Sequence, residues 1–358
     1  MRQAVQLPPG VTRELLPLTA EDGAGVDAAL YLRSGARPAT ALVFMHPTVS
    51  FLHHYALIPL AGRGYAALGL NSRFAGNEAQ LLIDQVVLDL AAGVAELRER
   101  GFERVVLVGN SGGGALAAFY QAQAEESVPG RPPADALIVL NAHRGRPQVL
   151  TAWLDPSVTD ESDPLSVNPA LDMFDQRNGP PYRPDFVERY RAAQEARNRR
   201  ITAWARERLE SSGDLAFVVH RTAADLRFVD LTLDPSDRVV GTYWGPDVRA
   251  ANYAAGGLAR FSTLRSWLSQ WGLDTSPAAA EPSLARCHMP MLFIQGTADQ
   301  GIFPSDAQAL FEAAGAEDKQ LRWVPGGSHY FLGQPDPQRQ VYDLIESWLA
   351  ARGMPARR

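Results

Sequence analysis

The chain has 358 residues, of which 46% are hydrophobic and 21% are charged, so it can bury a large core as one big domain or two smaller ones. Its formal net charge of −6 gives no overall attraction to nucleic acid or to an anionic membrane, and neither is expected as a partner. The single cysteine, Cys287, excludes an intrachain disulfide bond and fits a reducing compartment; it is expected to pack in the core.

The first residues contain no apolar stretch of the length found in signal peptides, and nowhere do about 18 apolar residues follow one another. The chain is therefore expected to be cytoplasmic. No metal or cofactor is expected, because His53 and His54 are neighbours that would point apart on a helix and no Cys-x-x-Cys pair occurs. We expect a small-molecule substrate as the partner. Whether identical subunits assemble into an oligomer is left open.

The first part of the chain predicts an antiparallel strand pair, followed by alternating strands and helices. Apolar stretches flank the turn signal Glu21-Asp22-Gly23, as in a β-hairpin. Residues 78–100 carry apolar side chains at helical spacing, which predicts a helix that covers the sheet. Such an alternation with short links demands a mainly parallel sheet with right-handed crossovers. The elements expected before residue 78 are strands at 14–19, 27–32, 41–45 and 65–71 and a helix at 55–61.

Residues 105–116, Val-Val-Leu-Val-Gly-Asn-Ser-Gly-Gly-Gly-Ala-Leu, form the most informative stretch. A short apolar strand leads into Ser111 and continues as a helix. Turning from strand to helix in so few residues strains the serine backbone, and side chains at Gly109 and Gly113 would collide with the turn. The pattern predicts a nucleophile elbow that exposes the Ser111 hydroxyl at a helix N-terminus. The alternative, a phosphate-binding loop, would need a Gly-Lys-Ser/Thr ending that this stretch lacks.

A serine nucleophile of this kind needs an acid and a base, in the chain order Ser, Asp, His. Residues 291–299, Met-Leu-Phe-Ile-Gln-Gly-Thr-Ala-Asp, predict a buried strand followed by Asp299, the expected acid. The last expected strand leads into the loop Pro-Gly-Gly-Ser-His, whose histidine, His329, is the expected base. His143 follows another apolar strand and is the main rival base, but it precedes Asp299 in the chain. The remaining histidines are expected to pack or to face solvent.

An acyl-transfer intermediate needs N–H donors for its oxyanion. One donor is expected from Gly112, the residue after the nucleophile. The second is expected from the loop His46-Pro47-Thr48, which follows the strand at 41–45. Because Pro47 has no N–H, the sequence predicts Thr48 as this second donor.

Together these motifs resemble the α/β-hydrolase superfamily over residues 1–143 and 287–358. The resemblance implies an α/β fold with a mostly parallel central sheet flanked by helices, and catalysis by a Ser–Asp–His triad. The elbow Gly-Asn-Ser-x-Gly-Gly also resembles that of the meta-cleavage-product hydrolases, which split carbon–carbon bonds in vinylogous diketones; His46-Pro47-Thr48 stands where that group has a glycine-rich loop. The residues that carry the resemblance are His46-Pro47, Gly109-Asn110-Ser111-Gly112-Gly113, Gly296-Thr297-Ala298-Asp299 and Gly327-Ser328-His329.

Between residues 144 and 286 the alternation of strands and helices stops. This segment is too long for a structureless loop, so it is expected to be an inserted, mainly helical cap domain, with 1–143 and 287–358 as the core domain. Within it, residues 226–233 predict one strand of a small hairpin, and residues 251–271 predict a helix.

A strongly helical stretch at 186–209 is rich in arginine. Most of these arginines are expected on solvated faces, paired with Glu188, Glu195 and Glu207. In the alternative, one or two of them enter the pocket and clamp a substrate carboxylate with paired hydrogen bonds. The arginines are Arg189, Arg191, Arg197, Arg199, Arg200, Arg206 and Arg208.

The sequence thus predicts a serine hydrolase of the carboxylesterase class that cleaves a small to medium, largely apolar ester. Ser111 would attack the carbonyl while His329 takes its proton, Asp299 would stabilise the imidazolium, and water would resolve the acyl-enzyme. Two alternatives are kept: a carbon–carbon bond hydrolase that uses the same triad, and a receptor that keeps the fold but only binds its ligand.

Overall fold

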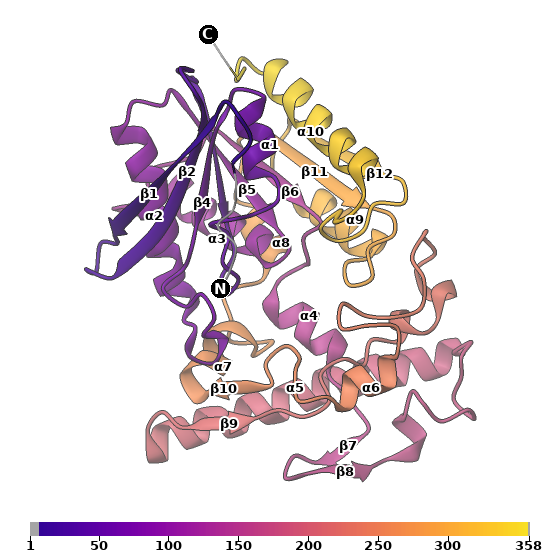
Figure 1. The fold of residues 1–358 in the computed structure, drawn as a ribbon. Helices are drawn as coiled ribbons and strands as arrows, with labels where there is room; N and C mark the ends of the chain where they lie inside the picture. Colours follow the sequence, from indigo (N-terminus) through magenta and orange to yellow (C-terminus); the bar gives the residue numbers. More distant parts are fainter. Residues whose placement is uncertain (1–6, 357–358) are drawn as a thin grey trace.

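One central sheet organises the computed structural model, which describes residues 7–356 (Figure 1). The β1–β2 and β2–β4 pairs are antiparallel, and every other pair of neighbours in this sheet is parallel. The prediction of a mostly parallel sheet that opens with a hairpin is confirmed. Across the sheet the strands follow the order β1 (Val11–Thr19), β2 (Gly25–Arg33), β4 (Ala66–Leu70), β3 (Thr40–Met45), β5 (Arg104–Asn110), β6 (Ala136–Leu140), β11 (Met291–Gly296) and β12 (Lys319–Val324).

Helices cover both faces of the sheet. Side chains alternate along a strand, so Val105 and Leu107 of β5 pack on the face with α2, α3, α8 and α9, whereas Val106 and Val108 pack on the face with α1 and α10. A strand covered on both faces needs a continuous apolar run, as β5 has. None of the described helices is long and apolar enough to cross a membrane. The bounds are α1 (Leu57–Gly62), α2 (Ile83–Glu99), α3 (Gly112–Glu125), α8 (Ala280–Leu284), α9 (Pro304–Ala313) and α10 (Pro335–Ala350).

Between β6 and α8 the chain leaves the sheet and builds a second layer (Figure 1). The longest element, α5 (Pro184–Ser212), lies in this layer on the side away from the sheet and confirms the helix predicted at 186–209. The division into a core domain and a cap domain stays a prediction. The other elements of the layer are α4 (Arg146–Trp153), β7 (Val158–Asp160), β8 (Asp163–Val167), β9 (Ala216–Val218), α6 (Val248–Tyr253), β10 (Phe261–Thr263) and α7 (Leu264–Gln270).

Two local predictions in this layer are wrong. Residues 226–233 form two short 3₁₀ turns instead of a strand, because the side chains of Asp225 and Asp230 accept backbone N–H groups two residues ahead. The single helix predicted at 251–271 is interrupted by β10. Helix α7 then starts afresh, with the Thr263 side chain as its N-cap.

Cys287 is buried where α8 packs on α3, as expected. Its thiol lies 3.2 Å from the carbonyl oxygen of Ser283 and 3.5 Å from that of Ala118. Burial raises the pKa of the thiol to about 12, so it stays protonated at neutral pH. These contacts fit a packing role.

Candidate active site

Ser111 lies at the sharp turn between β5 and α3. Its backbone has φ 55° and ψ −124°, a conformation that non-glycine residues rarely adopt. The N–H of Ser111 donates to the carbonyl oxygens of Leu140 and Asn141, both at 3.2 Å, which ties the turn to the end of β6. A Cβ on Gly113 would overlap the carbonyl oxygen of Met45. The strained backbone and the close approach that a nucleophile elbow requires are therefore both present.

His329 and Asp299 meet beyond the ends of β12 and β11. Nδ1 of His329 donates to Oδ2 of Asp299 at 2.7 Å. Oδ1 of the same carboxylate accepts the N–H groups of Gly301 at 2.9 Å and Ile302 at 3.0 Å. Both side chains are buried. These three donors fix the carboxylate and hold the His329 proton on Nδ1, which leaves Nε2 able to accept a proton.

No hydrogen bond joins Ser111 to His329 in this structure. Nε2 of His329 is buried and has no hydrogen-bond partner within the described residues. Burial raises the pKa of Tyr330, and a bond between its hydroxyl and the Ser111 side chain acts against that rise. Asp299 and His329 are thus brought together, whereas Ser111 and His329 are not hydrogen-bonded to each other. Catalytic hydrogen bonds often tighten only when substrate binds.

The loop after β3 wraps around the His46 imidazole. Nδ1 of His46 accepts the N–H groups of Thr48 at 3.1 Å and Val49 at 3.0 Å. The N–H of Thr48 therefore points to His46 and not to the space beside Ser111. Its role as an oxyanion donor, like that of Gly112, stays a prediction.

Two imidazoles, those of His46 and His143, lie against Gly112. A Cβ on Gly112 would be 2.7 Å from Nε2 of His46 and 3.3 Å from Nε2 of His143. The sequence analysis names His143 only as a rival base, and it expects His46 to pack or to face solvent. Asp299 pairs with His329, so His143 lacks the carboxylate partner of a rival base. Within residues 7–356 no group of three or more His, Cys, Asp or Glu side chains is arranged to hold a metal ion.

Tyr243 reaches the His329–Asp299 pair from the layer between β6 and α8. Its hydroxyl lies 2.9 Å from Nδ1 of His329 and 3.4 Å from Oδ1 of Asp299. Although 39% of the residue is exposed, its hydroxyl lies inside, and burial raises the pKa of Tyr243 well above its ordinary value. The protonated phenol can donate to Asp299 while it accepts from Nδ1–H. No pattern around Tyr243 in the sequence singles it out.

Asn141, directly after β6, joins the parts of the site. Its Nδ2 donates to the carbonyl oxygens of His329 at 2.7 Å and Ser328 at 3.2 Å, and its Oδ1 accepts the N–H of Gly296 at 2.7 Å. The residue is fully buried and has φ 41°. Asn141 therefore fixes the loop that carries His329 to the end of β11, and its carbonyl holds the turn at Ser111.

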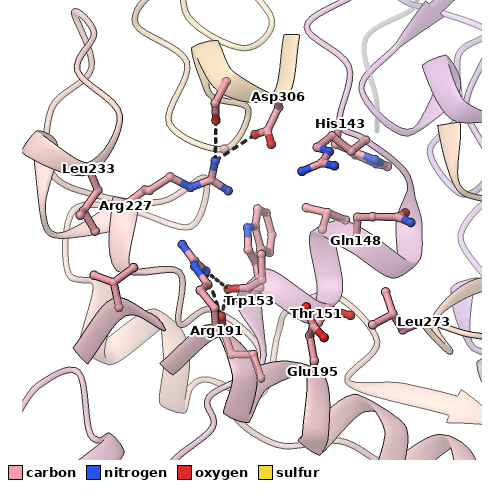
Figure 2. Close-up of a pocket in the computed structure, with 17 residues that line it drawn as sticks. His143, Gln148, Thr151, Trp153, Arg191, Glu195, Arg227, Leu233, Leu273 and Asp306 are labelled. Carbon is pink, nitrogen blue, oxygen red and sulfur yellow. Dashed lines mark hydrogen bonds and ion pairs between the residues drawn. The ribbon is translucent and has the colours of Figure 1, made fainter. Parts of the chain in front are cut away.

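A cavity of about 510 Å³ lies beside the site, between the second layer and α9 (Figure 2). His143 and Gly301 line it, and the same two residues contact the surroundings of Ser111 and Asp299. Figure 2 shows Arg191 and Arg227 on one side of the hollow and His143 on the other. Ser111, Asp299 and His329 do not themselves line the cavity, which reaches their surroundings through His143 and Gly301.

Several α5 arginines form ion pairs, but the partners differ from those expected. Arg199 pairs with Glu195 at 3.0 Å, as predicted. Arg197 is buried against Glu161 at 2.7 Å. Arg191 lines the cavity and pairs with the buried Asp225 at 2.7 Å. Arg191 is thus the α5 arginine in a position to meet a ligand; a carboxylate clamp stays a prediction.

Comparison with known proteins agrees with this fold. Residues 263–336 match the family described as serine aminopeptidase, S33. A search of curated proteins finds no match. Solved structures with a similar fold have low sequence identity to this chain. This similarity therefore shows the fold but not the reaction.

Three solved structures illustrate the shared fold. A soluble variant of monoglyceride lipase from Saccharomyces cerevisiae is 14% identical, with 98% of this chain and 97% of that chain covered and a TM-score of 0.56. A hypothetical protein from Pseudomonas aeruginosa is 17% identical, with 96% and 95% covered and a TM-score of 0.55. An esterase from Pyrobaculum calidifontis is 13% identical, with 96% and 86% covered and a TM-score of 0.52.

Proposed function

We propose that the chain is a serine hydrolase that cleaves small to medium, largely apolar esters through an acyl-enzyme on Ser111. The observation that carries the proposal is the hydrogen-bonded pair of His329 and Asp299, which lies at the same edge of the sheet as the strained turn of Ser111. Serine attack on an ester needs a base of this kind with a carboxylate behind it. The lipase and the esterase of the same fold are consistent with this chemistry.

In the proposed reaction the Ser111 hydroxyl turns from Tyr330 toward His329. Nε2 of His329 takes the hydroxyl proton as Oγ attacks the ester carbonyl carbon, and Asp299 stabilises the resulting imidazolium. The imidazolium then gives its proton to the leaving alkoxide, and the alcohol departs. A water molecule, deprotonated by the same Nε2, attacks the acyl-enzyme, which releases the carboxylic acid and restores Ser111.

We propose that residues 144–286 act as a cap over this site. The cavity between the second layer and α9 has a volume of about 510 Å³, within the range of about 300–1,000 Å³ that is typical of small-molecule sites. Val149, Trp153, Leu233 and Leu273 contribute apolar wall for an apolar acyl or alcohol group, and charged side chains such as Arg191 line the rest of the cavity. A hollow of this volume favours a small molecule over a polymer.

The test is hydrolysis of 4-nitrophenyl acetate and butyrate by the wild-type chain and by Ser111→Ala, together with fluorophosphonate labelling of Ser111. We expect labelling of the wild-type chain and a loss of about 10⁴-fold or more in kcat in the variant. A wild-type chain that is neither active nor labelled contradicts the proposal. Turnover of a vinylogous diketone with poor ester hydrolysis would favour the carbon–carbon bond hydrolase instead, and saturable binding without turnover would favour the receptor.

A further inference from the structure

The loop after β3 is fixed in a form that turns its backbone donors away from Ser111. The N–H groups of Thr48 and Val49 both donate to Nδ1 of His46, and Pro47 has no N–H to offer. The hydroxyl of Ser72 donates to the Pro47 carbonyl oxygen and holds the loop from its other side. The loop therefore presents the edge of an imidazole where the sequence predicts a backbone N–H.

Backbone contacts determine which ring nitrogen carries the proton in both His46 and His143. Nδ1 of His46 accepts two N–H groups, and Nδ1 of His143 accepts the N–H of Gly145 at 3.1 Å. A neutral imidazole that accepts at Nδ1 carries its proton on Nε2. Within residues 7–356 neither Nε2 has a hydrogen-bond acceptor, although His46 is only 7% and His143 only 8% exposed. Two N–H donors in largely buried rings are thus without a protein acceptor.

Both donors lie against the same residue. Nε2 of His46 and Nε2 of His143 lie 2.7 Å and 3.3 Å from the position of a Cβ on Gly112, the first residue of α3. The N–H of Gly112 is in the first turn of this helix, so it has no acceptor within the helix. The two imidazole Nε2–H groups therefore lie close to Gly112, whose own N–H is the third donor at this place.

The two imidazoles are neutral at the pH where esterases work. Burial, and after it the positive charge of Arg146, lowers the pKa of His46 well below its ordinary value and that of His143 to about 3. His54, a further buried imidazole, is occupied by Asn110 at 2.9 Å. A neutral N–H group keeps its proton throughout the reaction, so it stabilises negative charge without exchanging protons with His329.

We propose that the Nε2–H groups of His46 and His143 bind the oxyanion of the tetrahedral intermediate, with the N–H of Gly112 as the third donor. The inference rests on the proposed function and assigns to two side chains the role that the sequence analysis predicts for the N–H of Thr48. His143 also lines the cavity, so it contacts the reacting carbonyl from the side on which the substrate lies. The imidazoles form hydrogen bonds that strengthen as the carbonyl oxygen gains charge.

The variants His46→Asn and His143→Asn test this assignment. Oδ1 of asparagine keeps the acceptor that Nδ1 offers to the backbone, whereas no donor reaches the former position of Nε2. We expect each variant to lower kcat for 4-nitrophenyl butyrate by about 10²–10³-fold with little change in KM. A trifluoromethyl ketone, which forms an oxyanion on Ser111, is expected to bind more weakly by a similar factor. His143→Gln returns an amide donor and is expected to recover part of the rate.

His288→Asn is the matched control, because this histidine is exposed, and it is expected to keep the wild-type rate. If both asparagine variants keep wild-type kcat while the fluorophosphonate still labels Ser111, the inference is overturned and the proposed function stands. An inactive, unlabelled wild-type chain overturns the proposed function instead.

The tautomers can be measured without any activity. In Ser111→Ala, ¹⁵N NMR at pH 7 is expected to show His46 and His143 as neutral rings protonated on Nε2. A ring protonated on Nδ1, or an imidazolium, at either position contradicts the inference whatever the rate. This readout leaves both histidines in place, so it does not depend on how the asparagine variants fold.

Discussion

The hydroxyl of Tyr243 lies 2.9 Å from Nδ1 of His329, although the two residues belong to different layers of the molecule. The same hydroxyl lies 3.4 Å from Oδ1 of Asp299. The proposed acid–base pair thus has a partner in the segment that we propose as the cap. A movement of that segment would remove one hydrogen bond from the pair and change how firmly the imidazole is oriented.

We expect Tyr243→Phe to lower kcat about 3- to 10-fold with KM nearly unchanged, because one hydrogen bond contributes about 1 kcal/mol and the ring itself remains. Steady-state kinetics with 4-nitrophenyl butyrate measures both constants. Trp244→Phe is the control, since the neighbouring ring packs on Trp153 and does not contact the pair. Equal effects of the two substitutions would show that the phenol hydroxyl has no separate role.

Asn141→Ala is expected to weaken both stability and activity. The substitution leaves the carbonyl oxygens of Ser328 and His329 and the N–H of Gly296 without their partner. Each unpaired buried group costs about 1–3 kcal/mol, and alanine tolerates the positive φ less well than asparagine, so we expect a loss of about 3–5 kcal/mol in the free energy of unfolding.

Urea denaturation measures this loss, and the same samples are assayed for kcat/KM, which is expected to fall as the His329 loop loosens. Asn77→Ala, at an exposed position, should change stability by no more than about 0.5 kcal/mol. An Asn141→Ala chain as stable as the wild type would mean that these hydrogen bonds are replaced by water.

Gly113→Ala tests the close approach at the elbow. Its methyl group would overlap the carbonyl oxygen of Met45, so β3 or α3 has to shift, and overpacking of this kind costs about 1–3 kcal/mol. Because His46 follows Met45, we also expect activity to fall. Gly62→Ala is the control: no atom lies within 4 Å of a Cβ there, and in a helix alanine is more favourable by up to about 1 kcal/mol. Denaturant midpoints that rank the two variants the other way would contradict this packing argument.

The sheet and the positions of Ser111, Asp299 and His329 could be predicted because each depends on a local pattern. Each of the three residues follows an apolar run, and the ends of parallel strands meet at one edge of the sheet. Asn141 and Tyr243 carry no such local mark, since their roles come from contacts with residues far away in the chain. Sequence periodicity indicates which face of a helix or strand is buried. It does not indicate which polar groups form hydrogen bonds with each other.

The loop after β3 shows the same limit at close range. Excluding Pro47 left Thr48 as the next N–H in the chain, but the pattern could not show that the ring of His46 turns back to accept this N–H. Likewise, residues 226–233 alternate partly as a strand would, yet Asp225 and Asp230 offer the backbone a competing set of local hydrogen bonds. At both places, hydrogen bonds between nearby side chains and the backbone set the local structure.

Three buried imidazoles lead us to expect a loss of stability in mild acid. Burial lowers the pKa of His46, His54 and His143 below the ordinary value of 6.5, to about 4 for His54 and about 3 for His143. As the pH falls below 6.5, these three histidines become protonated in the unfolded chain but stay neutral in the folded chain. The stability contributed by these groups is therefore complete above pH 6.5 and is lost as the pH falls toward their folded-state pKa values.

Between pH 6.5 and pH 5 we expect the free energy of unfolding to fall with a slope that approaches about 4 kcal/mol per pH unit, about 1.4 kcal/mol for each of the three groups. Most carboxylates titrate below this window, so the histidines dominate it. Urea denaturation at steps of pH measures the slope. His143→Asn should reduce the slope by about one third, whereas His288→Asn, at an exposed site, should leave it unchanged. A slope that His143→Asn does not change would contradict a neutral, buried imidazole at that position.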